Sequence, residues 1–292
     1  MTDAIVGVDF GLSVTDAVLV RGGMAERHAS LLRPGPASPE VLRRALEALD
    51  VRADDVAAVA VTGGRSRDLA GEPKVVVVDE PTAIGRGALA AAGVERALAV
   101  SCGTGTAMVV ADAGAGTYRH VTGTPVGGGT LEGLGSALLG VSMASEIAAM
   151  ASRGDASQVD TTLGEVLGGG LGGLPPRATA VSLGRLAALG GRAGPDDLAA
   201  GLTTMVAQTI GLLALNAKAA HGLPHAVFVG RVATLPFVRS MVQAVFAVYG
   251  VEAPLFPEGG DHAVALGAAH AAGGVSPANG GAGRRRPVRS ER

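Results

Sequence analysis

Short apolar runs alternate with amphipathic segments along the whole chain, and this pattern predicts a mixed α/β fold. Runs typical of strands occupy residues 4–9, 16–21, 56–62, 75–79, 98–102, 107–111 and 226–229. Apolar residues recur at helical spacing over residues 38–49, 81–92, 130–139, 143–152, 196–221, 235–248 and 263–272. Because strands and helices interleave throughout, we expect one α/β architecture.

Two pairs of strands are joined in the same way, by a short polar turn that contains glycine. Residues 4–9 and 16–21 flank the first turn, and residues 98–102 and 107–111 flank the second. Strands this close predict β-hairpins. The repeated hairpin predicts two lobes of similar design that face a shared ligand.

The expected domain organisation follows from this repetition. We place an N-terminal lobe at residues 1–95 and a C-terminal lobe at residues 96–275. Residues 164–176 hold many glycines and two prolines, which predicts a loop. Residues 276–292 contain Gly, Arg and Ser without apolar periodicity, so we expect a disordered tail.

Composition narrows the class of protein. Hydrophobic residues make up 48% of the 292 residues, and the formal net charge of −2 favours neither nucleic acid nor an anionic membrane as partner. The single cysteine, Cys102, excludes an intramolecular disulfide, and its apolar strand predicts a buried small hydrophobe. The N-terminal residues do not resemble a signal peptide, and polar residues interrupt the long apolar segment 196–221. We therefore expect a soluble, cytoplasmic protein.

The first polar turn has the chemistry of a phosphate site. Small residues such as Gly11 and Ser13 let backbone N–H groups and hydroxyls approach phosphate oxygens closely. Asp9 ends the preceding strand, where its carboxylate is suited to holding Mg²⁺. The same pattern also occurs in purely structural hairpins, so this turn alone does not decide the function.

Two further glycine clusters strengthen the case for a phosphate ligand. The second hairpin turn consists of Gly103, Thr104, Gly105 and Thr106. The first and second turns together resemble the two phosphate-binding hairpins of the actin-like ATPases, which grip a nucleotide from both lobes. The P-loop pattern and a strand-linked GxGxxG pattern are absent.

The third cluster precedes a predicted helix and consists of Gly127, Gly128 and Gly129. Free N–H groups at a helix start favour an anion. A flexible loop capped at Thr130 is the alternative interpretation.

A carboxylate pair, Asp79 and Glu80, follows the apolar run 75–78. A carboxylate at a strand end is suited to act as general base toward a hydroxyl nucleophile. Phosphoryl transfer needs mainly positioning, charge neutralisation and one such group. Taken alone, an acidic pair of this kind is more often simply solvated.

These motifs, in this order, resemble those of the type II pantothenate kinases. The resemblance includes residues 61–64, Asp79 and Glu80, the segment SCGTGTAM and the segment VTGTPVGGGTLEGLGSALLG, and it extends to about residue 273. It implies an actin-like, ribonuclease-H-like fold with two lobes and a homodimer formed through the long helix at 196–221. The implied reaction transfers the γ-phosphate of ATP to pantothenate, the first step towards coenzyme A.

The resemblance also assigns roles to individual residues. Asp9 would serve Mg²⁺ and the phosphates, and Glu80 would be the catalytic base. The nucleotide would be held by Gly11, Ser13, Gly103, Thr104, Gly105, Thr106, Gly127, Gly128 and Gly129. The acceptor would be bound near Arg119, His120 and Thr122.

The chain departs from the family pattern at four positions. Leu12 and Asp16 stand in the first turn where the family has a glycine and a lysine. A carboxylate in place of a cation should weaken nucleotide binding unless Asp16 points away or acts through the metal. His120 replaces an arginine that holds the pantothenate carboxylate, and Val264 replaces a glycine near the adenine.

Three alternatives remain open at this point. One is a kinase that acts on another small hydroxylated metabolite, and another is a nucleotide-binding pseudokinase without turnover. The third is a lobe of a hydantoinase-like ATPase, which the segment SVTDAVLV resembles and against which the GGGTLEGLG pattern speaks.

Overall fold

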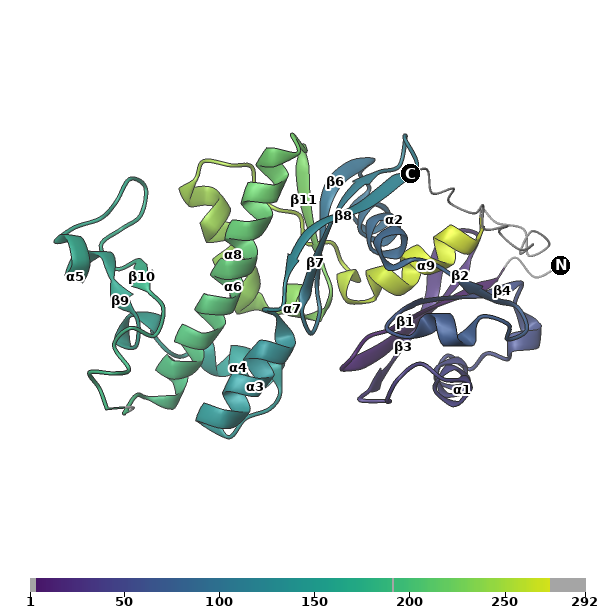
Figure 1. Ribbon diagram of the computed structural model, residues 1–292, viewed down its shortest axis with the longest axis horizontal. Coiled ribbons are helices and arrows are strands. Elements are labelled where there is room, and N and C mark those ends of the chain that lie inside the picture. Colours follow the sequence, from purple (N-terminus) through teal and green to yellow (C-terminus); the bar gives the residue numbers. More distant parts are fainter. Residues whose placement is uncertain (1–3, 191, 274–292) are drawn as a thin grey trace, which may run out of the picture.

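The computed structural model describes residues 4–190 and 192–273, which form two β-sheets with helices between and around them (Figure 1). The first sheet has the strand order β3-β2-β1-β4-β5. Its strands are β1 (Ile5–Phe10), β2 (Val14–Arg21), β3 (Met24–Leu32), β4 (Ala58–Gly63) and β5 (Val75–Val77). The second sheet has the order β11-β6-β7-β8. Its strands are β6 (Arg96–Cys102), β7 (Thr106–Asp112), β8 (Thr117–Thr124) and β11 (His225–Val229).

The two sheets share one topology. In the first sheet, β1 pairs antiparallel with β2 and parallel with β4. In the second sheet, β6 pairs antiparallel with β7 and parallel with β11. A third antiparallel strand extends each hairpin, β3 in one sheet and β8 in the other. The repeated hairpins in the sequence therefore correspond to two halves of the same design.

Helices cover both faces of both sheets, which explains why the central strands are apolar at most positions. Side chains alternate between faces along a strand. Leu98 and Val100 thus join the core under α6 (Pro195–Ala220) and α8 (Pro236–Val248), whereas Ala97 and Ala99 face α2 (Glu80–Ala92). In the first sheet, the outer core is completed by α1 (Pro39–Ala48), which Ser38 caps as predicted.

The helices α2 and α9 (Ala263–Gly273) pack together between the two sheets (Figure 1). The chain order is crossed here: α9 follows the second sheet but packs on β1 and β4, and α2 follows the first sheet but packs on β6, β7 and β8. The division into lobes at residue 95 remains a prediction. The two helices approach closely because a glycine of α2, Gly87, packs directly against the backbone of α9. A Cβ on Gly87 would lie 1.8 Å from the carbonyl oxygen of Ala263.

Substitution of Gly87 by alanine is therefore expected to destabilise the protein. The added methyl group must push α2 and α9 apart, and overpacking of this kind costs about 1–3 kcal/mol of the free energy of unfolding. Urea unfolding followed by circular dichroism measures the change. Gly133→Ala is the matched control, because a Cβ there meets no atom within 4 Å, and alanine is the better helix former by about 1 kcal/mol. Equal stability of the Gly87→Ala protein and the wild type would contradict the close-contact argument.

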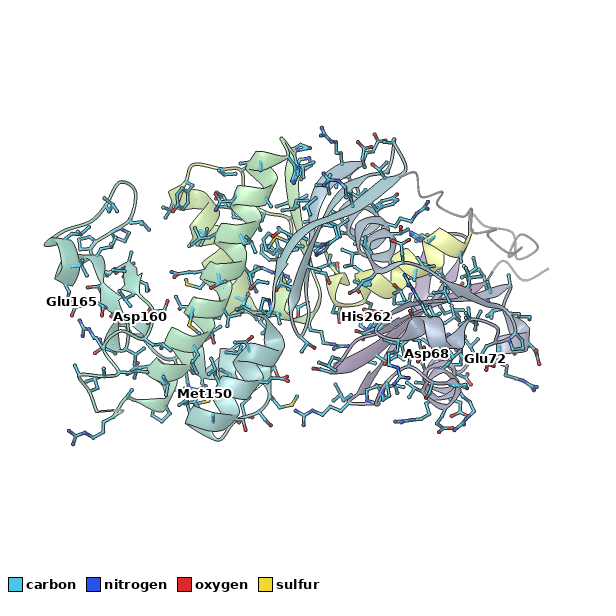
Figure 2. The ribbon with its side chains drawn as sticks, viewed as in Figure 1. Asp68, Glu72, Met150, Asp160, Glu165 and His262 are labelled. Carbon is cyan, nitrogen blue, oxygen red and sulfur yellow. The ribbon has the colours of Figure 1, made fainter. Side chains whose placement is uncertain are left out.

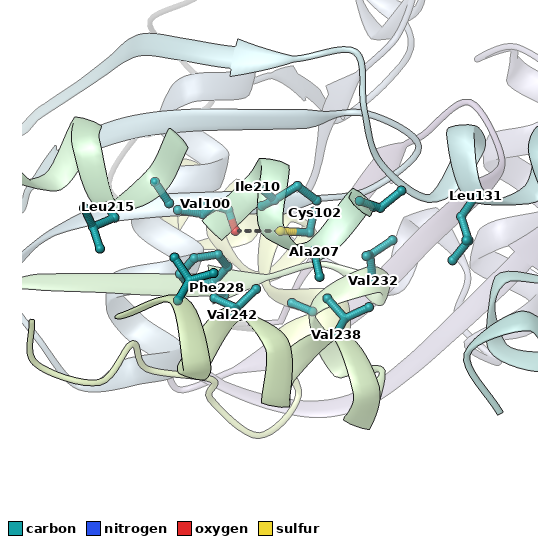
Figure 3. Close-up of a cluster of buried hydrophobic side chains, with 14 of the residues drawn as sticks. Val100, Cys102, Leu131, Ala207, Ile210, Leu215, Phe228, Val232, Val238 and Val242 are labelled. Atoms are coloured by element: carbon teal, nitrogen blue, oxygen red, sulfur yellow. Dashed lines mark hydrogen bonds between the residues drawn. The ribbon is translucent and has the colours of Figure 1, made fainter. Parts of the chain in front are cut away.

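The largest core lies beneath α6, and Figure 3 shows part of it. Cys102 is buried there beside Val100 and Phe228, with its thiol 3.9 Å from the Val100 carbonyl oxygen. Burial raises the pKa of the Cys102 thiol to about 12. Cys102 is therefore a buried small hydrophobe, as the sequence predicted, and not a nucleophile.

The helix α6 is long and apolar enough to cross a membrane by length and composition, but 72% of its apolar window is buried inside the part of the chain that the structure describes. A core helix explains this composition. Leu212 is 37% exposed on the remaining outer stripe. A dimer formed through this helix remains a prediction.

An excursion between β8 and α6 carries small elements that the sequence did not predict. It contains β9 (Thr161–Thr162), α5 (Leu163–Leu167) and β10 (Thr179–Val181). The prediction of a loop over residues 164–176 was wrong at its start, because Thr162 and Glu165 form a capping box that begins α5. Buried Asp160 accepts hydrogen bonds from the Thr179 hydroxyl and the Leu183 N–H, both at 2.7 Å, and so holds the excursion together (Figure 2).

The remaining helices are α3 (Gly128–Leu139), α4 (Ala144–Ala151) and α7 (Arg231–Thr234). Short 3-10 turns occupy Ala53–Asp55, Ser66–Leu69, Ala156–Gln158 and Gly260–His262. The predicted tail, residues 276–292, lies outside the described residues.

Candidate active site

A cavity of about 300 Å³ lies where the carboxyl ends of β1 and β6 approach each other. The carboxyl ends of parallel strands are the usual place for ligand sites in α/β proteins. The residues that line the cavity include Asp9, Gly11, Ser13 and Asp16 from the first hairpin and Gly103, Thr104, Gly128, Gly129 and Arg231 from the second half. The two turns singled out in the sequence thus face one space.

A hydrogen bond joins the two turns directly. The hydroxyl oxygens of Ser13 and Thr104 lie 2.9 Å apart, although 91 positions separate the two residues. Leu12 is 84% exposed at the tip of the first turn. The structure therefore brings the predicted nucleotide residues Ser13 and Thr104 together at the mouth between the sheets.

The third glycine cluster differs from its predicted form, because its N–H groups are not free for an anion. The N–H groups of Gly128 and Gly129 donate to the carbonyl oxygens of Gly103 and Thr104, at 2.8 and 2.9 Å. The N–H of Gly127 donates to the Thr130 hydroxyl at 3.3 Å. The cluster holds the second turn in place, and only Gly128 and Gly129 of the three line the cavity.

Two other residues predicted to bind the nucleotide, Gly105 and Thr106, instead make hydrogen bonds that stabilise the second turn. The Thr106 hydroxyl is buried and donates to the Val126 carbonyl oxygen at 2.9 Å. The Gly105 carbonyl oxygen accepts the N–H of Gly103 at 2.9 Å. Gly105 and Thr106 do not line the cavity. Any effect that they have on nucleotide binding is therefore indirect, because they fix the conformation of the second turn.

Asp16 is buried and its charge is balanced by residues that come from far along the chain. Arg231 donates a hydrogen bond to its carboxylate, and the Ser30 hydroxyl donates another at 2.6 Å. Arg231 also donates to the Ser30 hydroxyl at 2.5 Å. His262 completes the group, with its Nε2 3.1 Å from the Ser30 hydroxyl and 3.7 Å from Asp16. The acidic departure in the first turn is therefore paired with a cation.

Sequence reasoning missed Arg231. Its position carries a signal, because it directly follows Gly230 at the end of β11, the strand parallel to β6. A residue there must lie beside the turn that follows β6. Arg231 is the only basic side chain among the described residues that line this cavity, against the carboxylates of Asp9, Asp16, Glu132 and Asp261.

Asp9 lines this cavity and lies beside Gly63, which lines a second one. In the register of the first hairpin it stands directly opposite Asp16. Burial, followed by the charges of Asp16 and Glu80, raises the pKa of Asp9 to about 7. The neighbouring Gly63 has φ +84°, and a Cβ there would lie 2.6 Å from an oxygen of Asp9. Glycine therefore lets the chain pass close to this carboxyl group.

The second cavity, of about 690 Å³, contains Glu80. Its lining includes Gly63, Arg65, Arg67, Asp79 and Glu80. Asp79 accepts the N–H of Thr82 at 3.0 Å and caps α2, which fixes Glu80 as the first helical residue. Asp9 of the first cavity and Gly63 of the second are neighbours, and we call this place the junction. The two hairpin turns line the first cavity, and Glu80 lines the second.

The predicted acceptor residues are placed differently. Arg119, His120 and Thr122 lie on β8, the edge strand of the second sheet, and line neither of these two cavities. Their strand is irregular, because Met108 pairs with Thr122 and Val109 pairs with His120. Val264 does line the first cavity, beside Gly230 and Asp261.

Within residues 4–190 and 192–273, no three or more His, Cys, Asp and Glu side chains are grouped closely enough to hold a metal ion by themselves.

Comparison with known proteins places the chain in a family. The type II pantothenate kinase of Bacillus cereus is 24% identical over 223 residues, which cover 72% of this chain and 80% of that protein. Component A of the (R)-2-hydroxyglutaryl-CoA dehydratase of Acidaminococcus fermentans shares the fold, with a TM-score of 0.68 at 18% identity, over 93% of this chain and 98% of that one.

A glucokinase of the ROK family from Streptomyces griseus, solved with glucose and AMPPNP, has a TM-score of 0.59 at 14% identity, over 92% of this chain and 98% of that one. These likenesses establish the actin-like ATPase fold that the two hairpins predicted. The sequence profile of the Fumble family matches residues 96–258, which is more than half of the chain. The chain therefore belongs to the Fumble family, the family of the type II pantothenate kinases.

Proposed function

We propose that this protein transfers the γ-phosphate of ATP to the primary hydroxyl of pantothenate and so forms 4′-phosphopantothenate. The observation that carries the proposal is the junction at Asp9. There the cavity lined by the two glycine-containing turns lies beside the cavity that contains the Glu80 carboxylate, which we assign as the base. Membership of the Fumble family and the glucokinase-like fold support a phosphotransferase at this junction.

In this proposal, residues of the first cavity bind the nucleotide and a residue of the second cavity activates the acceptor. The hydroxyls of Ser13 and Thr104 would bind the triphosphate, and Arg231 would contribute its positive charge while it stays paired with Asp16. Glu80 takes the proton of the acceptor hydroxyl as its oxygen attacks the γ-phosphorus. The bond from that phosphorus to the bridging oxygen breaks, and ADP leaves with the electron pair. Positioning and charge neutralisation supply most of the rate.

The residues fit a magnesium ion that arrives with the nucleotide. Burial and two neighbouring carboxylates raise the pKa of Asp9 to about 7. A cation bound beside Asp9 would stabilise its charged form. Proteins bind Mg²⁺ through one or two carboxylates together with substrate phosphates. Asp9 would hold the ion, which when bound neutralises charge on the transferred phosphoryl group.

Nucleotide binding is expected to depend strictly on Mg²⁺. The first cavity presents four carboxylates and one arginine to a triphosphate, and like charges in a confined space repel strongly. Calorimetric titration with a non-hydrolysable ATP analogue should show affinity that falls at least about tenfold in EDTA. Equal affinity with and without Mg²⁺ would argue that the triphosphate does not enter this cavity.

A coupled assay of ADP release tests the proposed reaction. Purified protein with Mg²⁺ and ATP should release ADP in proportion to added pantothenate, and mass spectrometry should find 4′-phosphopantothenate. Reactions without acceptor give the background hydrolysis. Normal ATP binding without pantothenate-dependent release would contradict the proposal.

One observation favours testing a second acceptor class. Arg119, His120 and Thr122, which the family resemblance assigns to pantothenate, lie outside both cavities. Another small hydroxylated metabolite is therefore the alternative acceptor, and the same assay run with a panel of hydroxy acids and sugars distinguishes the two.

A further inference from the structure

The loop between β4 and β5 places two arginines in the second cavity, on the same side of the junction as Glu80. Arg65 and Arg67 line it together with Asp79 and Glu80. We propose that Arg67 anchors a carboxylate of the acceptor, so that the substrate carries a hydroxyl near one end and an anionic group at the other. The inference rests on the proposed kinase function and assigns the anchor to a loop of the first lobe.

The loop is held firmly enough to form a site. The Ser66 hydroxyl is directed at the Gly63 carbonyl oxygen at 2.9 Å, and both Ser66 and Leu69 are buried. Arg65 takes the left-handed backbone conformation, with φ +61°. A non-glycine residue keeps such a conformation only where its surroundings fix it. The side chain of the next arginine therefore starts from a fixed backbone.

The two arginines differ in their partners. The guanidinium of Arg65 donates to Asp68 at 2.9 Å from Nε and lies 2.8 Å from it at Nη2, so its charge is already matched. Arg67 makes no salt bridge and no side-chain hydrogen bond within the described part of the chain. Arg67 is therefore the cation that the second cavity offers to a ligand.

The chemistry of a guanidinium selects the ligand. Five N–H donors in a planar fork match the two oxygens of a carboxylate. The nucleotide phosphates do not compete for Arg67, because their turns line the other cavity. A volume of about 690 Å³ is in the range of small-molecule sites. An acid with its hydroxyl at Glu80 and its carboxylate at Arg67 would span this cavity.

The test compares an acid acceptor with its neutral counterpart. Steady-state kinetics of Arg67→Gln are measured with pantothenate and with pantothenol, in which an alcohol replaces the carboxylate. The KM for pantothenate should rise about ten- to hundredfold, as expected for a lost charged hydrogen bond, while kcat and the KM for pantothenol change little. Arg44→Gln, which removes an exposed arginine on α1, is the matched control. Arg119→Gln tests the competing anchor on β8.

The outcomes separate failure of this inference from failure of the proposed function. Equal effects of Arg67→Gln on both acceptors, or a selective loss of pantothenate in Arg119→Gln, would overturn the inference while the kinase function stands. Absence of turnover in the wild type would instead refute the proposed function. Even then, calorimetric titration with pantothenate tests the role of Arg67. If pantothenate binds and only Arg67→Gln weakens its affinity, the anchor is supported. If the affinity is the same in Arg67→Gln and the wild type, or if pantothenate does not bind, the inference is overturned.

Discussion

Replacement of Glu80 by glutamine is expected to lower kcat for acceptor-dependent ADP release by about 10²- to 10⁴-fold, the usual contribution of a general base. Glutamine keeps the size and polarity of the side chain but accepts no proton. Glu80 starts α2 and is exposed at the second cavity, and its side chain has no hydrogen-bond partner among the described residues. Nucleotide affinity and stability should therefore stay close to those of the wild type.

A matched control isolates this effect from the loss of one surface charge. Glu72→Gln removes an exposed carboxylate from the loop before β5 (Figure 2) and should leave kcat unchanged. Single-turnover measurements separate the chemical step from product release. If the Glu80→Gln protein turned over as fast as the control, another group must accept the proton.

Replacement of Asp9 by asparagine is expected to abolish turnover and, at the same time, to stabilise the metal-free protein. The carboxyl pKa in the folded protein is raised to about 7, whereas an unfolded aspartate titrates near 3.9. The folded state therefore holds a proton that the unfolded state has released between these values. Stability of the wild type falls as the pH rises through this window and levels off above about 7.

The neutral asparagine removes this pH dependence. The difference in Tm between Asp9→Asn and the wild type, measured in EDTA, should be small near pH 4, grow up to about pH 7 and then remain constant. Added Mg²⁺ with a non-hydrolysable nucleotide should raise the Tm of the wild type alone. Asp54→Asn, at an exposed position, is the control. A Tm difference that does not change with pH would show that Asp9 is not a buried, charge-crowded acid.

The parts of the fold that the sequence predicts are those with two covered faces. The strands β6 and β11, which contain Val100 and Val227, show clear apolar runs because they pack on a core. The helix α6, which contains Leu202, shows clear apolar periodicity for the same reason. Neither β3 nor β8 was predicted, because both are edge strands whose side chains are largely exposed. Their pairing is set by a neighbouring strand and not by an apolar pattern of their own.

The site divides in the same way. Ser13, Thr104 and Asp9 were found because each stands in a local motif, a turn or a strand end. Arg231 meets Asp16 across 215 positions, and no local pattern links such residues. The N–H groups of Gly128 and Gly129 were misjudged because a sequence does not reveal that a neighbouring turn supplies their acceptors.

The crossed placement of α2 and α9 has a consequence for synthesis of the protein. The inner face of the first sheet, with Val18 and Val20, is covered by α9, the last helix of the described chain. A ribosome completes that sheet's strands long before α9 emerges, so the nascent first sheet exposes an apolar face until α9 has been translated. Contacts between such distant segments slow folding and leave intermediates open to aggregation. We therefore expect that the first sheet does not fold stably without α9, and that a fragment ending before α9 needs chaperones to remain soluble.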